Sequence, residues 1–233
     1  MISSFPQRAA IAFALFGTSV VSADTMTVEF LGAGPKKSVD YYFNGHTGSA
    51  SAGVYNWTGG LQTFCVQLRE SISVGDVVEY KIVDAWKVPE SPPGPGRMGQ
   101  VRLALVKDLY ARWYDTVMSK TGGAAKRHAA AFAMNVWEIT HQNADEDSAM
   151  SVLNKLDFEI GNARFSGSNA VNNLANEMLE SLGGGEYAFL DFDGLYGLKN
   201  SDFQDQLAVE VPVPGPAGLA ALIGLSALRR RRR

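Results

Sequence analysis

The chain has 233 residues, of which 46% are hydrophobic and 10% aromatic, so it can bury a core, which excludes wholesale disorder. Its 21 basic and 24 acidic residues give a formal charge of −3, but six of the basic residues are Arg8 and the arginines of residues 229–233. Residues 24–228 therefore carry 15 basic and 24 acidic groups, a net charge of −9, which argues against nucleic acid as a partner.

The first residues predict a secretory signal peptide, residues 1–23. Arg8 precedes an apolar run over residues 9–21, and small Ala23 precedes Asp24. Val21 and Ala23 occupy the minus-three and minus-one positions that a signal peptidase selects, so we expect cleavage between Ala23 and Asp24. An uncleaved membrane anchor is the alternative, which the short apolar run disfavours.

Strand patterns dominate the first part of the body, which we expect to be one domain over residues 24–210. Alternating or β-branched and aromatic residues predict strands. A Gly/Ser-rich stretch, residues 45–60, predicts a loop or hairpin tip, and the prolines and glycines of residues 89–99 predict a break. The predicted strands are residues 27–30, 39–43, 61–68, 77–83, 156–160, 187–192 and 207–211.

Helical patterns follow, so the fold class is α+β. Within residues 100–118, Val101, Leu105, Leu109 and Trp113 recur every four positions, which predicts an amphipathic helix. Two more helices are expected, over residues 124–140 and 169–182. The first of these is apolar almost all round, which indicates a core helix.

Residues 211–233 combine three features in order: prolines, an apolar run and arginines. The prolines hold the chain extended, so a helix can begin only near Pro216. The apolar run, residues 217–228, would then be roughly 18 Å long, well short of the ~30 Å of a bilayer core. Clustered arginines resist translocation and prefer anionic lipid. The motif residues are Pro212, Pro214, Gly215 and Pro216, and the basic stop is Arg229, Arg230, Arg231, Arg232 and Arg233.

This tail resembles the PEP-CTERM family of bacterial sorting tails, in its variants with VPxPA-like or PGP-like proline motifs. The resemblance implies recognition by an exosortase-type membrane transpeptidase, transient membrane anchoring and delivery to the cell surface or outside the cell. The sequence departs from the family motif because it lacks the glutamate of Pro-Glu-Pro and has Gly215 between Pro214 and Pro216. An ordinary tail anchor and a basic lipid-binding tip remain as alternatives.

Two segments of the body, residues 63–68 around Cys65 and residues 131–139, resemble the signature segments of thioester-domain proteins, which are surface adhesion domains. The resemblance implies an antiparallel barrel or sandwich with an inserted helical subdomain. It also implies a thioester-like site formed by Cys65 and the residue at the family's glutamine position, which is Ala133 in this chain.

The chemistry of thioester formation limits which properties of the family can be expected of this chain. The bond forms when a thiolate displaces ammonia from a side-chain carboxamide, and Ala133 has no carboxamide. Gln67 is sterically awkward for ring closure, and Asn135 lies at the wrong helical angle. We therefore expect Cys65 to be a buried thiol, and the only cysteine excludes a disulfide within the chain.

Other candidate sites are weaker. Asp145 and Asp147 offer oxygen ligands for calcium, but they lack the EF-hand spacing, and a solvated acidic loop is the better explanation. The histidines are scattered, so we predict no metal site and no cofactor. Trp57, in the predicted glycine-rich loop, is the aromatic residue we would test for glycan contact.

Together these patterns predict an exported, non-enzymatic bacterial surface or exopolysaccharide-matrix protein. Its expected partners are an exosortase-type enzyme, the membrane through the tail, and an exopolysaccharide or surface ligand, with no nucleic acid. A covalent adhesin using Cys65 is the alternative, and a secreted hydrolase is the reading with least support.

Overall fold

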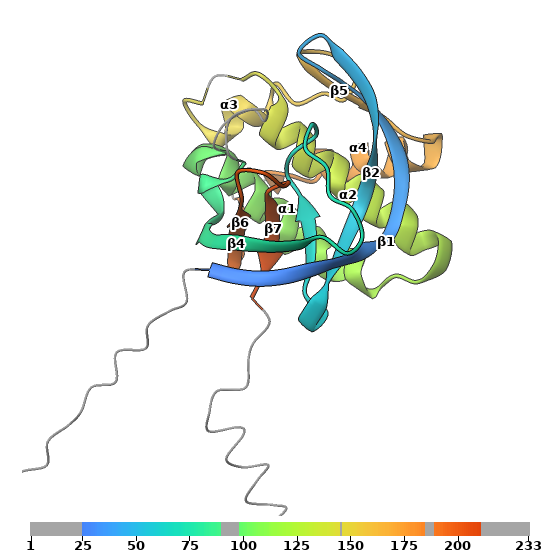
Figure 1. The fold of residues 1–233 in the computed structure, drawn as a ribbon. Coiled ribbons are helices and arrows are strands. Elements are labelled where there is room, and N and C mark those ends of the chain that lie inside the picture. The colour runs from blue at the N-terminus through green and yellow to red at the C-terminus, as the bar shows by residue number, and fades with distance from the viewer. Residues whose placement is uncertain (1–24, 90–97, 145, 185–188, 211–233) are drawn as a thin grey trace, which may run out of the picture.

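Antiparallel strands and α-helices make up the part of the chain that the computed structural model describes, residues 25–89, 98–144, 146–184 and 189–210 (Figure 1). This confirms the predicted α+β class. The strands are β1 (Thr25–Phe43), β2 (His46–Trp57), β3 (Gln62–Cys65), β4 (Val77–Asp84), β5 (Ala163–Ser166), β6 (Leu195–Lys199) and β7 (Gln206–Val209). The α-helices are α1 (Gly99–Ser119), α2 (Gly122–His141), α3 (Ala149–Leu153) and α4 (Asn169–Glu180), and short 3-10 helices cover Thr58–Gly60 and Ala85–Lys87.

The strand pairings form a closed circuit. The long strand β1 pairs through residues 25–29 with β4, through residues 30–43 with β2, and through residues 40–43 with β5. The order is β2-β3-β7-β6-β4-β1-β5, and β2 also returns to β1. Six strands thus join in a ring, and β5 extends it at the far end of β1. All the pairings are antiparallel.

The sequence predicted a loop or hairpin tip over residues 45–60, but most of this segment is strand β2, and the hairpin tip is confined to Asn44 and Gly45. Asn44 and Gly45 both have positive φ, 48° and 85°, which is the two-residue turn that matches the twist of paired strands. Farther along, Gly53 lies against the irregular part of β1, where an added Cβ would meet the Pro35 carbonyl oxygen. The glycines of this segment therefore make close strand pairing possible.

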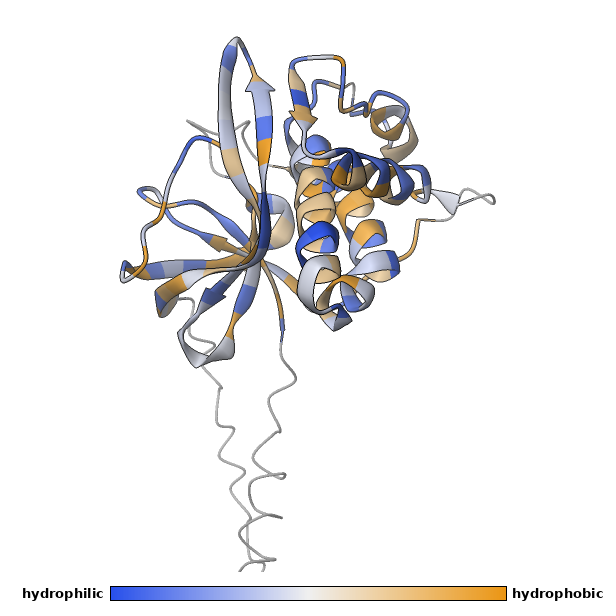
Figure 2. Cartoon of the chain, turned by 90° about the vertical axis from the view of Figure 1, so that its right-hand side faces the viewer, coloured by the Kyte–Doolittle hydropathy of each residue, from blue (hydrophilic) through white to orange (hydrophobic). Residues whose placement is uncertain are grey.

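Helix α2 is the centre of the core, as its apolar sequence predicts. Residues 129–142 are all buried, and α2 contacts β1 and β2 on one side and α1 and α4 on the other. Figure 2 shows the strand circuit on one side of the body and the helices on the other, with the apolar residues concentrated between them. The α-helices α1 to α4 of the described residues lie in sequence between β4 and β6.

Among the remaining elements, the sequence predicted the longer helices correctly and several strands wrongly. Helices α1, α2 and α4 lie close to their predicted bounds. Residues 156–160 form turns rather than a strand, residues 189–192 have no regular structure, and β5 and β6 were not predicted. These short strands are held by partners distant in sequence, because β5 pairs with the end of β1 and β6 with β4 and β7.

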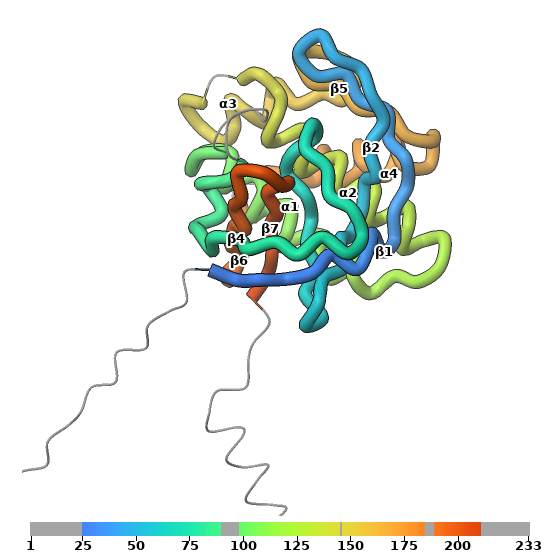
Figure 3. Tube along the Cα trace, in the orientation of Figure 1, coloured from blue at the N-terminus to red at the C-terminus, as the bar shows by residue number. Residues whose placement is uncertain are grey.

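The body begins and ends at the same end. Since β1, β4, β6 and β7 pair antiparallel in that order, the start of β1 and the end of β7 face the same way. The tube in Figure 3 shows this, with β5 and the β1–β2 tip at the opposite end. Buried hydrophobic residues from Val28 to Ala208 form one cluster, so the described residues share one core. None of the described helices is both long and apolar enough to span a membrane.

Candidate functional site

Cys65 ends β3 at a point where three elements meet. Its neighbour across the sheet is Gln206 of β7, and both side chains are almost completely buried. The thiol donates a hydrogen bond to the carbonyl oxygen of Gln67 at 2.8 Å. The indole nitrogen of Trp137 on α2 donates to the carbonyl oxygen of Cys65 at 2.9 Å. The cysteine is therefore fixed by its own strand and by the core helix.

The two segments predicted to form a thioester-like site lie against each other. The rings of Phe64 and Phe132 have centroids 4.6 Å apart, and Trp137 bonds to Cys65. With 3.6 residues per turn, Ala133 lies on the helix face between Phe132 and Trp137 and is itself buried. Its methyl group fills space on that face but offers no carbonyl carbon to the thiol.

The nearby carboxamides are engaged in joining strands and helices. The side-chain oxygen of Gln67 accepts from the backbone N–H of Asp205. The Gln206 oxygen accepts from the Thr63 hydroxyl at 2.9 Å. Asn135 donates at 3.0 Å to the carbonyl oxygens of Ala131 and Ala175, so it ties α2 to α4, away from Cys65. These side chains therefore have structural tasks in the folded chain.

The Cys65 thiol also has low reactivity as a nucleophile. Burial raises the pKa of Cys65 to about 12, helped by the negative charges of Asp205 and Glu70, although the hydrogen bonds with Gln67 and Trp137 oppose the shift. At neutral pH the group is therefore the uncharged thiol. Because the thiolate is the nucleophile, this site is poorly suited to attack a carbonyl or to form a thioester in the folded state.

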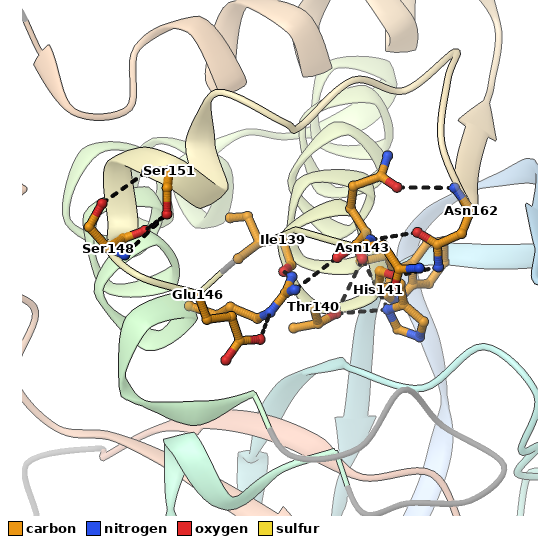
Figure 4. Close-up of polar contacts among 11 residues, drawn as sticks. Ile139, Thr140, His141, Asn143, Glu146, Ser148, Ser151 and Asn162 are labelled. Atoms are coloured by element: carbon orange, nitrogen blue, oxygen red, sulfur yellow. Dashed lines mark hydrogen bonds and ion pairs between the residues drawn. The ribbon is translucent and has the colours of Figure 1, made fainter.

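A second polar cluster closes the C-terminal end of α2 (Figure 4). Carbonyl oxygens at a helix end have no partner within the helix and need one elsewhere. The guanidinium of Arg102 donates to the carbonyl oxygens of Ile139 and Gln142 and pairs with the carboxylate of Glu146 at 2.7 Å. The Asn162 amide donates to the carbonyl oxygen of His141 at 3.0 Å. The positive guanidinium also matches the negative end of the helix dipole.

Glu138 and His141 in this cluster are buried ionisable groups. Burial raises the pKa of the Glu138 carboxyl to about 8, although bonds from the Asp157 N–H and the Gln142 amide oppose the shift. Burial lowers the pKa of His141 to about 3. Glu138 accepts from Asp157 at 2.8 Å and from Gln142 at 3.0 Å, which anchors the loop before β5 to α2. We assign this cluster to folding because it holds the helix end and that loop in place.

An open groove lies at the other end of the body from the start of β1. One depression, of about 320 Å³, lies where the ends of β1 and β5 meet α4 and the turn before β5. A second, of about 510 Å³, continues along α4 toward Leu182. The two share Glu159 and Asn176, so they form one groove. Both volumes are in the range of ligand pockets, roughly 300–1,000 Å³.

The walls of this groove combine aromatic rings with planar polar groups. Tyr41 and Tyr42 are half-buried, and the guanidinium of Arg164 lies 3.9 Å from the centroid of the Tyr42 ring. The buried rings of Phe158 and Phe165 support the groove from the core side. The polar lining comes from Asp40, Glu159, Arg164, Ser166, Asn172 and Asn176.

The sequence did not predict the groove because its residues come from four separate segments. The available signal was the pair Asn172 and Asn176, four positions apart on α4, because residues at this spacing share one helix face. Two amides on the exposed side of a helix that is otherwise rich in apolar contacts indicate a polar surface that is available for binding.

The structure contradicts the expectation that Trp57 is an exposed loop residue. It ends β2, is only 1% exposed, and donates from its indole nitrogen to the Thr63 hydroxyl at 2.8 Å. It cannot contact a glycan in this fold. Its flanking glycines made it look like a loop residue, but strand pairing buries it.

The acidic loop proposed for calcium lies only in part among the described residues. Asp145 falls outside them, and Glu146 pairs with Arg102 rather than pointing to a shared ion. Among the described residues, no group of three or more His, Cys, Asp or Glu side chains is placed to hold a metal ion.

The terminal sites predicted from sequence also lie outside the described residues. They are the cleavage position Ala23 and Asp24, the motif residues Pro212, Pro214, Gly215 and Pro216, and the arginines 229–233. Comparison with models of protein families, with curated proteins and with solved structures found no match.

Proposed function

We propose that the chain is an exported, non-enzymatic bacterial protein of the cell surface or extracellular matrix, sorted through residues 211–233. The observation that carries the proposal is the order of three features in the tail sequence. Pro212, Pro214 and Pro216 come first, twelve apolar residues follow, and five arginines come last. Its resemblance to PEP-CTERM tails suggests an exosortase-type enzyme as partner. The alternatives for the tail remain a simple membrane anchor and a lipid-binding tip.

The arrangement of the body supports this proposal. The described residues share one core from Val28 to Ala208, as expected of a folded body between export and sorting signals. The start of β1 and the end of β7 lie at one end, so a membrane-attached tail would leave the groove at the opposite end facing outward (Figure 1). Within the proposal we describe the strand circuit as a small β-barrel, since its pairings close on themselves.

A covalent adhesin is the second candidate, and it is favoured by the contact between β3 and α2 near Ala133. Two observations oppose it: the alanine has no carboxamide, and burial keeps Cys65 protonated. Intact mass decides between them. A thioester makes the mature body lighter by one ammonia than its sequence mass, and a Cys65→Ala variant must lose that difference. A full mass in the unreduced protein rejects the adhesin.

Tail-dependent fractionation tests the main proposal. Deleting residues 211–233 should move the product to a different cell fraction from the full chain. Replacing all five terminal arginines with glutamine removes the charge that marks the cytoplasmic side, and it should have a similar effect. Replacing them with lysine keeps the charge and is the matched control, which should fractionate like the wild type. Unchanged fractionation of the deletion would contradict the proposal.

A further inference from the structure

We propose that the groove along α4 binds a neutral oligosaccharide chain, an inference that rests on the proposed function of a surface or matrix protein and names its partner. The first step is length. The two depressions share Glu159 and Asn176 and together run from the ends of β1 and β5 to Leu182. A groove that continues past one pocket suits a ligand made of repeating units.

The second step is the chemistry of the walls. A sugar ring presents apolar C–H faces and rows of adjacent hydroxyls. Tyr42, which lines the groove and is half-buried, offers an aromatic face with a polar tip, a combination suited to a surface that is both apolar and wet. The ring of Tyr41 points to the opposite face of β1, because successive side chains of a strand alternate. Arg164 stacks on Tyr42, which restricts the ring before any ligand arrives. Asn172 and Asn176 supply planar amides that both donate and accept, as adjacent hydroxyls require.

Fixed positions of these polar groups favour binding further. The side-chain oxygen of Asn172 accepts from the backbone N–H of Gly167 at 2.7 Å, so its amide is held in one orientation. Groups that are already ordered lose less entropy when a ligand binds.

The third step is charge. Among the residues lining the groove, Asp40, Asp157, Glu159 and Glu180 are acidic and Arg164 is basic, a formal net charge of −3. Such a lining repels chains that carry carboxylate, sulfate or phosphate groups. The ligand class is therefore an uncharged glycan rather than a polyanionic one.

An extended peptide fits this groove less well. Peptides are often bound by adding a strand to an open sheet edge, through main-chain hydrogen bonds. Here the outer edge of β5 is engaged, because the Phe165 N–H donates to the carbonyl oxygen of Phe158 at 2.9 Å. Recognition must therefore come mainly from side chains, which suits a ligand with many hydroxyls.

Calorimetric titration of residues 24–210, which contain the whole of the described core, tests the inference. The probes are four neutral hexasaccharides (cellohexaose, laminarihexaose, maltohexaose and chitohexaose), an oligogalacturonate, and a lysine-rich peptide. We expect at least one neutral hexasaccharide to bind, with the oligogalacturonate failing. Asn176→Ala should weaken that binding by about tenfold or more, since a lost good hydrogen bond is worth about 1.4 kcal/mol.

Asn173→Ala is the matched control, because Asn173 is exposed on the same helix and does not line the groove. It should leave the affinity unchanged, and thermal unfolding of both variants verifies that they fold. Binding of no neutral hexasaccharide, binding of only the oligogalacturonate or only the peptide, or equal loss in both variants would each overturn the inference. Since the assay omits the tail, such a failure leaves tail-dependent sorting untouched.

Discussion

The Cys65 region and the α4 groove contain similar residue types but differ in what those residues can reach. Around Cys65, Gln67 and Gln206 are buried, and their polar atoms bond to neighbouring strands. In the groove, Arg164 and Asn176 are exposed, and solvent reaches the lining. The contrast indicates that a cysteine with nearby carboxamides is here a structural joint, whereas the binding surface is assembled from common polar residues.

If the buried polar clusters are structural, breaking the one at the end of α2 should have the largest effect on stability. Arg102→Met removes the donor from two helix-end carbonyl oxygens and leaves Glu146 unpaired. We expect a loss of about 3–5 kcal/mol in the free energy of unfolding. Urea denaturation of the body followed by circular dichroism measures it.

Lys107→Met is the control for this variant on the same helix. Lys107 pairs with Asp191, whose side chain is 73% exposed, so water screens the pair and its loss should cost much less stability than the loss of Arg102. Equal losses for the two variants would contradict the structural role of the buried cluster.

The Cys65 joint should show the next largest effect. Trp137→Phe deletes the indole donor to the Cys65 carbonyl oxygen and leaves a space against the Phe165 ring. The expected cost is about 2–3 kcal/mol. In the control, Trp113→Phe, the lost bond runs to the half-exposed Ser181 hydroxyl, which water can replace, so the cost should be smaller. If denaturant titration showed a larger loss for Trp113→Phe than for Trp137→Phe, the result would contradict a structural role for the contact between Trp137 and Cys65.

The fold was predictable where local patterns suffice. Helices α1, α2 and α4 follow from apolar spacing, because one face of each must be buried whatever its neighbours are. Strand β2 was missed because its Gly/Ser-rich sequence reads as a loop, although Asn44-Gly45 is a strong hairpin signal. Strands β5 and β6 depend on partners far along the chain, which no local pattern reveals.

The candidate sites divide in the same way. The meeting of Cys65 with the α2 segment was expected from a resemblance, but the burial of Trp57 was not. The groove combines residues from β1, β5, α4 and the turn before β5, so only the fold brings them together. Sequence can nominate residue types, whereas accessibility depends on pairings between distant segments.

Ionisation of Glu138 gives a smaller, pH-dependent effect. Its pKa is about 8 in the folded chain against an ordinary 4.5, so the folded state keeps a proton that the unfolded chain has lost. Stability therefore falls as pH rises toward 8. His141, lowered from 6.5 to about 3, acts in the opposite direction below pH 6.5 and offsets Glu138 there. Between pH 6.5 and 8 the net loss should be about 1 kcal/mol, because Glu138 is half-ionised in the folded chain at pH 8 and His141 still offsets part of the loss near pH 6.5.

Glu138→Gln should flatten this slope, because the amide keeps an acceptor for the Asp157 N–H but does not titrate. Glu177→Gln, at an exposed position of α4, should leave the slope as in the wild type. Unfolding free energies at pH 6.5, 7.2 and 8 check both. The same slope in wild type and Glu138→Gln would mean that another group is responsible.

Groove substitutions should have the smallest effects on stability. Glu159→Gln and Asn176→Ala change exposed side chains that no buried network needs, so the free energy of unfolding should stay within about 0.5 kcal/mol of wild type. Denaturant titration of each variant checks this. A loss above about 1.5 kcal/mol for either variant would mean that the groove residues also stabilise the fold. The Cys65 region and the groove would then not differ in role.

The most direct measurement of the whole account is the intact mass of the protein recovered from the cell surface or medium. We predict a chain that starts at Asp24, lacks Arg229 to Arg233, and has the full mass of its sequence, with Cys65 as a free thiol. A product that still spans Met1 to Arg233 would contradict export and sorting. A mass short by one ammonia would contradict the structural role of Cys65.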